Sequence, residues 1–445
     1  MCRRYRPSWT GSAPRDAPIG IIGAGEGGLL ALYAAAVDTR IGAAAVSGYF
    51  GPRQRVWEEP IYRNVWALLD EFGDAEIASL VAPRALIVEA APCVTVDGPP
   101  PPAGGRNDAA PGRIRTLALE DVEREAARAR ALLAGLTPPA EFAFVNAMEG
   151  HAGSDETLRR LMSALNAGAA LASSGTTPVL ARELPDAEAR MKRRFDQLVE
   201  HTQRVMREAP FARERFWSKA DRASAEAWQQ STAWYRDYFW EEVIGKLPPA
   251  TVPANPRTRL IFDEPQYYGY EVKLDVYPDV FAYGLLLLPK DVKKGERRPV
   301  VVCQHGLEGT PAKCADPRVQ EPAYNQYACR LAERGFVVYA PQNPYIGGDA
   351  FRVLQRKANP LKLSLFSFIV RQHERTLEWL ASQPFADPAR IGFYGISYGG
   401  KTAMRVPALL DDYCLSICSA DYDEWIWKNC STRHTYTYLH TGEYE

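Results

Sequence analysis

The sequence has few of the features that mark membrane or nucleic-acid-binding proteins. No apolar run reaches the roughly 18 residues that a membrane-spanning helix needs. The 53 Lys and Arg residues are balanced by 54 Asp and Glu residues, whereas a nucleic-acid-binding domain usually carries a basic excess. We therefore expect no membrane span and no nucleic-acid partner.

The cysteines and the N-terminal segment lack the patterns of a small secreted protein. None of the eight cysteines belongs to a C-x-x-C pair, and the closest two are Cys414 and Cys418. Disulfide frameworks are typical of short secreted chains, so these cysteines are predicted to be buried apolar residues or free thiols. Residues 1–18 form an irregular, basic segment without the apolar stretch of a signal peptide. The compartment is left open, because the natural N-terminus is expected to be missing.

What the sequence does contain is an alternation of short apolar runs and helical stretches. In residues 19–166, a Leu/Ala-rich stretch (29–37) and an amphipathic stretch (154–166) predict helices. Strands are expected at 19–23, 41–48, 84–89 and 141–147. This alternation is typical of a parallel sheet flanked by helices. The region is therefore predicted to be one α/β module.

A second set of the same kind occupies residues 251–445. Residues 167–250 begin with small residues and continue as charged, aromatic helical stretches, which predicts a linker and a helical segment. In the second set, a helix is expected at 366–383 and strands at 268–275, 280–288, 300–306, 336–341, 391–394 and 414–420. The predicted fold class is α/β, with two tandem modules of mostly parallel sheet joined by the helical segment.

An internal repeat relates the two modules. IGIIGAGEGG (19–28) matches IGFYGISYGG (391–400) at five of ten positions, with an offset of 391 − 19 = 372. A repeat this long indicates duplicated domains rather than a repeat array. With this offset, the strand at 300–306 has no counterpart in the first module. The part of the first module after position 73 (445 − 372) has no counterpart in the second module. Each module is expected to be truncated, at opposite ends.

Residues 395–400 carry the clearest chemical motif. They read Gly-Ile-Ser-Tyr-Gly-Gly, which fits G-x-S-x-G. In a nucleophile elbow this pattern places the serine on a strained turn between a strand and a helix, with glycines where side chains cannot fit. The motif follows a predicted strand and opens a predicted helix, so Ser397 is the predicted nucleophile. The alternative is a glycine-rich turn with a capping serine.

The predicted strand at 300–306 ends at His305-Gly306, and Leu307 follows it about 90 residues before the elbow. The loop after such a strand helps to form the oxyanion hole, together with the residue that follows the nucleophile. The backbone N–H groups of Gly306, Leu307 and Tyr398 are the predicted donors. His305 itself is predicted to be structural rather than the catalytic base.

The second module resembles the acetyl-xylan-esterase and dienelactone-hydrolase branch of the α/β-hydrolase superfamily. The resemblance rests on VVVCQHGLEG, RLAERGFVVYAP, HERTLEWLASQPFADPARIGFYGISYGG and the strand after them. It covers roughly residues 260–445 and, more weakly, residues 19–166. It implies a Ser–His–acid hydrolase that acts on small carboxylic esters and needs neither a metal nor an organic cofactor.

In the first module, the repeat puts Gly25 at the position of Ser397. That module therefore cannot form an acyl-serine intermediate, and a carboxylate nucleophile at Glu26 is disfavoured because Glu26 aligns with Tyr398. The resemblance implies that His151, after the strand at 141–147, occupies the position of the triad histidine. It implies that Asp97 occupies the position of the triad acid, with Glu89 as the alternative. His151 could equally be a relic on a loop.

The second module offers no histidine at the family position. His434 and His440 come too early and would be non-standard bases, and His373 lies on the helix before the elbow. The aromatic residues near Trp425, Trp427 and Tyr436 could line a pocket, although a core position is the better interpretation.

The strand order argues against a hybrid triad of Ser397, His151 and Asp97. Two extra strands between the modules would displace His151, the base, by roughly 10 Å from Ser397. A working hydrogen bond between the serine and the histidine needs a distance of about 3 Å. We therefore expect little or no esterase activity from this chain. A non-catalytic pseudo-hydrolase that acts as a scaffold or binding protein is the alternative function, and the oligomeric state is left open.

Overall fold

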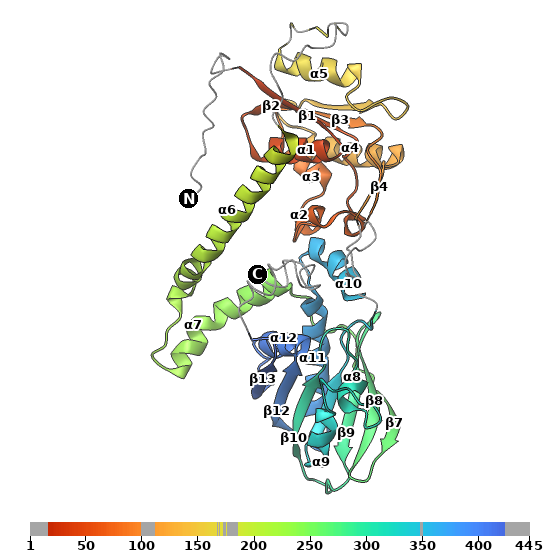
Figure 1. Ribbon diagram of the computed structural model, residues 1–445, viewed down its shortest axis with the longest axis vertical. Coiled ribbons are helices and arrows are strands. Elements are labelled where there is room, and N and C mark those ends of the chain that lie inside the picture. The colour runs from red at the N-terminus through yellow and green to blue at the C-terminus, as the bar shows by residue number, and fades with distance from the viewer. Residues whose placement is uncertain are drawn as a thin grey trace. The chain divides into compact units, whose positions relative to one another are not determined.

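A computed structural model describes residues 17–98, 112–166, 186–347 and 350–422, together with residues 168, 170, 171 and 175. The chain divides into two compact units (Figure 1). Unit 1 contains the described residues up to 171 and residues 350–363, and unit 2 contains the described residues of 175–347 and 364–422. No helix in the described part of the chain is long and apolar enough to cross a membrane.

Unit 1 contains a four-stranded parallel sheet with the order β1-β2-β3-β6. The strands are β1 (Ile19–Ala24), β2 (Ile41–Ser47), β3 (Ala85–Ala90) and β6 (Phe142–Asn146). Every strand lies within one residue of its predicted bounds. A short antiparallel ribbon follows β3 and is formed by β4 (Val96–Gly98) and β5 (Gly112–Ile114).

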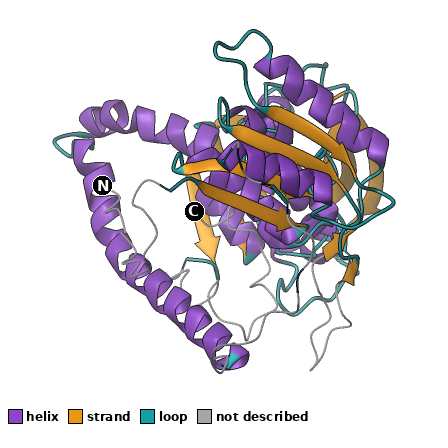
Figure 2. Ribbon diagram, turned by 90° about the horizontal axis from the view of Figure 1, so that it is seen from above, coloured by secondary structure: helices purple, strands orange, loops and turns teal. Residues whose placement is uncertain are grey.

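Helices cover both faces of this sheet (Figure 2). One face packs against α1 (Glu26–Val37), α3 (Asp74–Ser79) and α4 (Leu119–Leu133) through a core that includes Leu32, Ile77 and Val122. The other face packs against α5 (Asp155–Leu165) through Leu161 and Leu165. Unit 1 also contains α2 (Leu68–Glu71) and α10 (Ala350–Ala358).

Unit 2 contains a seven-stranded mixed sheet with the order β13-β12-β10-β11-β9-β8-β7. The strands are β7 (Arg257–Asp263), β8 (Tyr267–Tyr277), β9 (Val280–Pro289), β10 (Arg298–Gln304), β11 (Val337–Pro341), β12 (Ala386–Ile396) and β13 (Leu415–Ser419). The first three form an antiparallel meander, and the last four are parallel to one another. β7 was not predicted, because it is an edge strand with mostly exposed side chains and so lacks an apolar run.

The helices of unit 2 include α8 (Pro311–Ala315), α9 (Tyr327–Glu333), α11 (Leu365–Ala381) and α12 (Tyr398–Arg405). The segment before the sheet contains α6 (Ala187–Phe216), which has no buried residue, and α7 (Ala225–Tyr238). Parallel strands flanked by helices in both units confirm the predicted fold class.

The two units share a local backbone arrangement with the offset found in the sequence. Ala24 of β1 pairs with Ser47 of β2, and Ile396 of β12 pairs with Ser419 of β13. Both differences are 372 (396 − 24 and 419 − 47). The residues after the second strands, Gly48 and Ala420, have φ angles of 60° and 61°. The sequence repeat is therefore also a repeat of strand register.

Candidate active site

Ser397 lies on a strained turn between β12 and α12. Its φ and ψ angles are 59° and −117°, a conformation that side-chain-bearing residues rarely adopt because of steric repulsion. Its N–H donates to the carbonyl of Ser419 at 2.9 Å, and its side chain is exposed. This is the geometry of a nucleophile elbow, which presents a hydroxyl above the ends of the strands.

The elbow needs glycine at two flanking positions. A Cβ atom on Gly395 would lie 1.9 Å from the carbonyl oxygen of Gly399. A Cβ atom on Gly399 would lie 2.3 Å from the carbonyl oxygen of Gln304, the last residue of β10. The turn therefore packs directly against the end of the neighbouring strand, where no side chain fits.

The loop after β10 lies beside Ser397. A Cβ atom on Gly306 would lie 3.2 Å from the Cβ of Ser397, so the two predicted components of the site are brought together. The N–H of Gly306, however, donates to the Tyr324 hydroxyl at 2.8 Å. Tyr324 was not predicted, because it is 18 residues away and belongs to no recognisable motif. Within the described part of the chain, the Leu307 N–H donates no hydrogen bond.

His305 is buried and holds this loop in place. Its Nδ1 lies 2.7 Å from the carbonyl oxygen of Gly306, and its Nε2 lies 3.4 Å from the N–H of Asn343. The two contacts fit a neutral ring that donates from Nδ1 and accepts at Nε2. Burial lowers the pKa of His305 to about 4, so the ring is uncharged at neutral pH and acts as a structural link.

His373 is also buried and directed elsewhere. It lies on α11, its Nδ1 is 2.7 Å from the Tyr413 hydroxyl, and its ring packs against Phe393. Burial lowers the pKa of His373 to about 3. The remaining histidine of the described part of unit 2, His201, is exposed on α6. None of the three forms a hydrogen bond with Ser397 among the described residues.

We expect acid to destabilise unit 2 through these two buried histidines. A histidine whose pKa is lower in the folded state binds fewer protons there than when unfolded, so stability is full above pH about 6.5 and falls as the pH drops. The pH range over which stability is lost runs from about 6.5 down to about 4 for His305 and down to about 3 for His373. Urea unfolding at pH 7 and pH 4 measures the loss, on the order of 3 kcal/mol for each group.

Two variants separate this effect from general acid sensitivity. His373→Asn keeps an amide near the Tyr413 hydroxyl but does not titrate, so it should lose less stability between pH 7 and pH 4 than the unmodified chain. His201→Asn changes an exposed ring and should leave the loss unchanged. An equal pH dependence in all three proteins would contradict the assignment to buried imidazoles.

Unit 1 has the same elbow backbone, with Gly25 at the position that corresponds to Ser397. Gly25 has φ and ψ angles of 54° and −115°, and its N–H donates to the Ser47 carbonyl at 2.9 Å. The next residue, Glu26, is half-exposed and forms an ion pair with Arg63. Its carboxylate is therefore paired with a guanidinium.

The other two predicted triad residues, Asp97 and His151, are exposed and are not hydrogen-bonded to each other. Asp97, on the β4–β5 ribbon, is 3.8 Å from Arg115, and its side chain is 75% exposed. His151 lies on the loop between β6 and α5 and is exposed. Among the described residues of unit 1, no hydrogen bond joins His151 to Asp97 or to Glu89.

Glu89, the alternative acid, is buried in a dense set of hydrogen bonds at the end of β3. Its carboxylate accepts from the hydroxyls of Ser47, Ser154 and Thr157. It also accepts from the N–H groups of Gly153 and Ser154. Burial alone raises the pKa of a carboxyl, but these hydrogen bonds outweigh it and lower the pKa of Glu89. Glu89 therefore anchors the start of α5 as a carboxylate.

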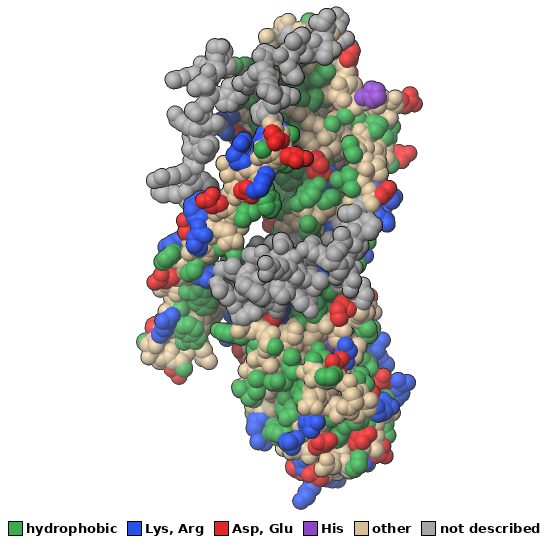
Figure 3. All heavy atoms as spheres, viewed as in Figure 1, with side chains coloured by type: hydrophobic (Ala, Val, Ile, Leu, Met, Phe, Trp, Pro, Cys, Tyr) green, Lys and Arg blue, Asp and Glu red, His purple; other side chains and the backbone are tan. Residues whose placement is uncertain are grey.

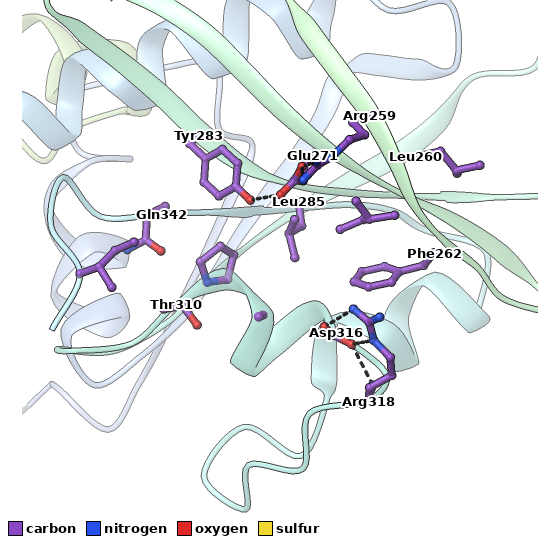
Figure 4. Close-up of a pocket in the computed structure, with 14 residues that line it drawn as sticks. Arg259, Leu260, Phe262, Glu271, Tyr283, Leu285, Thr310, Asp316, Arg318 and Gln342 are labelled. Carbon is purple, nitrogen blue, oxygen red and sulfur yellow. Dashed lines mark hydrogen bonds and ion pairs between the residues drawn. The ribbon is translucent and has the colours of Figure 1, made fainter.

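A cavity of about 680 Å³ lies elsewhere in unit 2, between the antiparallel strands and the 310–318 segment (Figure 4). Glu271 accepts from the Tyr283 hydroxyl at 2.9 Å and from Arg259. Asp316 forms an ion pair with Arg318 at 2.8 Å. The charged groups of Glu271, Asp316 and Arg318 in this cavity are thus paired with neighbouring side chains. Ser397 is not among the residues that line the cavity.

The strand order of unit 2, its serine elbow and the helix that follows define an α/β-hydrolase fold. No family model matches the chain. The chain is 27% identical over 206 residues to mouse dipeptidyl peptidase 8 and 26% identical over 206 residues to the human protein. This match covers 45% of the chain and 20% of each peptidase. The chain thus spans about a fifth of the length of these relatives.

Solved structures similar to the chain include two esterases. One is a candidate acetyl xylan esterase from Bacteroides fragilis, with 18% identity and a TM-score of 0.37 over 43% of this chain and 53% of that one. Another is a glucuronoyl esterase from Solibacter usitatus, with 16% identity and a TM-score of 0.34 over 43% of this chain and 58% of that one.

Proposed function

We propose that unit 2 is a serine hydrolase module for carboxylic esters, with Ser397 as its nucleophile. The observation that carries the proposal is the strained backbone of Ser397, with a φ angle of 59° and an exposed hydroxyl. Strain of this kind costs about 1–3 kcal/mol and persists where the surrounding structure imposes it, often at functional sites.

In the proposed reaction, the Ser397 oxygen attacks the ester carbonyl carbon and transfers its proton to a base, and the carbonyl oxygen becomes an oxyanion. Leu307 and Tyr398 are the proposed donors to that oxyanion, since backbone N–H groups beside an elbow stabilise the developing charge. Gly306, proposed with them, contributes only when its N–H leaves the Tyr324 hydroxyl.

In the described residues of unit 2, no histidine is hydrogen-bonded to Ser397, so we expect turnover of ester substrates to be low. His434 and His440, the non-standard candidates for the base, lie outside the described residues, as do Trp425, Trp427 and Tyr436. Covalent labelling is a sharper test than turnover, because one reaction per molecule is enough to detect it.

A fluorophosphonate is expected to modify the chain at Ser397, as located by mass spectrometry of tryptic peptides. The Ser397→Ala variant should not be labelled. His151→Ala should be labelled like the unmodified chain, because the exposed His151 is not expected to serve Ser397. Labelling that His151→Ala abolishes would contradict this expectation and support a triad with His151 and Asp97.

The alternative function is a non-catalytic scaffold or binding protein. It is favoured by Gly25 in unit 1 and by the lack of a histidine hydrogen-bonded to Ser397 among the described residues of unit 2. A folded chain that the fluorophosphonate leaves unmodified at Ser397 would support this function and overturn the catalytic one.

Relief of backbone strain gives a second test of the elbow. Ser397→Gly is expected to be more stable than Ser397→Ala, because glycine adopts a positive φ angle without steric cost. The free energy of unfolding, measured in urea, should differ by about 1 kcal/mol. Both variants lack the hydroxyl and should not be labelled. Equal stability of the two variants would show that the turn is not strained.

A further inference from the structure

An apolar hollow lies on one face of the unit 2 sheet, beside its β13 edge. Its volume is about 480 Å³. Leu415 and Ile417 in β13 line it and are 56% and 46% exposed. Hydrophobic side chains gather over β12 and β13 in the space-filling view (Figure 3). We call this feature the β13 hollow, and its lining also includes Val301, Leu331, Phe336, Gly392 and Tyr394.

The same positions in unit 1 are covered by a helix. Gly392 pairs with Leu415 in unit 2, and Gly20 pairs with Ala43 in unit 1, with the offset of 372 at both positions (392 − 20 and 415 − 43). In unit 1, α5 packs on this face. A Cβ atom on Gly20 would lie 2.4 Å from the Cδ1 of Leu165.

The covering helix places two leucines one turn apart on the sheet. Leu161 and Leu165 belong to the same core cluster as Ala43 and Ala45, and Ala45 is the counterpart of Ile417 (417 − 372). Residues at i and i+4 share one face of a helix. Unit 1 thus shows how an amphipathic helix covers the surface that is open in unit 2.

The rim of the β13 hollow carries unpaired positive charge. Besides the strands and Phe336, its lining comes from α9, which includes Arg330, and from Arg334, the residue directly after α9. Arg330 donates to the carbonyl and side chain of Asn325, and Arg334 donates to the carbonyl of Arg330. In the described ranges, neither arginine forms an ion pair with a carboxylate. A ligand with an acidic flank would therefore complement this rim.

We propose that the β13 hollow binds an amphipathic helix of a partner protein, with leucine-type side chains at i and i+4 and carboxylates along one flank. Helix-in-groove recognition of this kind uses apolar anchors spaced along one helical face. The proposal does not depend on catalysis by Ser397, because the hollow is an open sheet face and not part of the elbow.

The probe is a fluorescein-labelled, acetylated and amidated peptide with the sequence of residues 153–166 and with Glu in place of Arg159 and Arg160. Titrating the full chain into this peptide should raise its fluorescence anisotropy to saturation. Ile417→Asp should weaken binding at least about tenfold, equivalent to about 1.4 kcal/mol. Its position is already exposed, so the variant should fold, and circular dichroism checks this.

Three comparisons make the test specific. Leu260→Asp changes an equally exposed residue on β7, at the opposite edge of the sheet, and should bind like the unmodified chain. Arg330→Glu should weaken binding of the acidic peptide but not of the peptide that keeps Arg159 and Arg160. A peptide with Asp at both leucine positions should not bind.

Two results would overturn the proposal. One is a lack of saturation up to about 1 mM of the added chain, a dissociation constant that corresponds to about −4 kcal/mol. The other is equal binding by Ile417→Asp and the unmodified chain, which would place the peptide elsewhere. If the peptide fails to bind while sedimentation shows a dimer that Ile417→Asp dissociates, the hollow is instead an interface between two copies.

Discussion

Replacing Gly399 with alanine is expected to destabilise unit 2 by about 3 kcal/mol or more and to abolish labelling of Ser397. The new Cβ atom would lie 2.3 Å from the carbonyl oxygen of Gln304 and 2.9 Å from that of His305. Both neighbours are backbone atoms, so no side-chain rotation relieves the overlap, and overpacking costs about 1–3 kcal/mol and occasionally more. Hydrogen exchange of peptides from β10 and β12 measures the loss locally.

Gly27→Ala is the matched control for this variant. Gly27 is the counterpart of Gly399 (399 − 372), yet a Cβ atom on Gly27 would meet nothing within 4 Å. Because alanine is the better helix former, this substitution in α1 should be neutral or stabilise unit 1 by up to about 1 kcal/mol. Comparable destabilisation by both variants would show that the contact with the end of β10 is not the cause.

Replacing Glu89 with alanine is expected to destabilise unit 1 by about 3–5 kcal/mol. The change leaves three buried or half-buried hydroxyls and two N–H groups without their acceptor, and each unsatisfied polar group costs about 1–3 kcal/mol before relaxation or entry of water. Hydrogen exchange should become faster first in peptides that cover the start of α5, where the N–H groups of Gly153 and Ser154 donate to Glu89.

Two variants distinguish this structural role from a catalytic one. Glu89→Gln keeps one acceptor oxygen and should cost less than Glu89→Ala. Asp97→Asn alters an exposed carboxylate and should leave the stability of unit 1 unchanged. A stable Glu89→Ala protein would refute the anchoring role and leave Glu89 open as the triad acid.

Local sequence patterns were sufficient to predict most of the strands. The strands of unit 1 could be predicted because short apolar runs are separated by helices and turns, and the elbow because glycines flank Ser397. Edge strand β7 could not be predicted, since its side chains are mostly exposed and carry no burial pattern. β12 begins at Ala386, earlier than predicted, because Ala386 pairs with Arg298 of β10, and that pairing depends on a residue 88 positions away (386 − 298).

The sequence by itself determined the repeat, the strand–elbow–helix order and the presence of Gly25 at the position that corresponds to Ser397, since each depends on residues close together in the chain. Only the tertiary structure decided that the Gly306 N–H is bound by Tyr324 and that Glu89 is an anchor. The groups around Glu89 lie 42 to 68 positions away along the chain. Burial and hydrogen bonding of a polar group depend on which distant segments fold against it, and no local pattern contains that information.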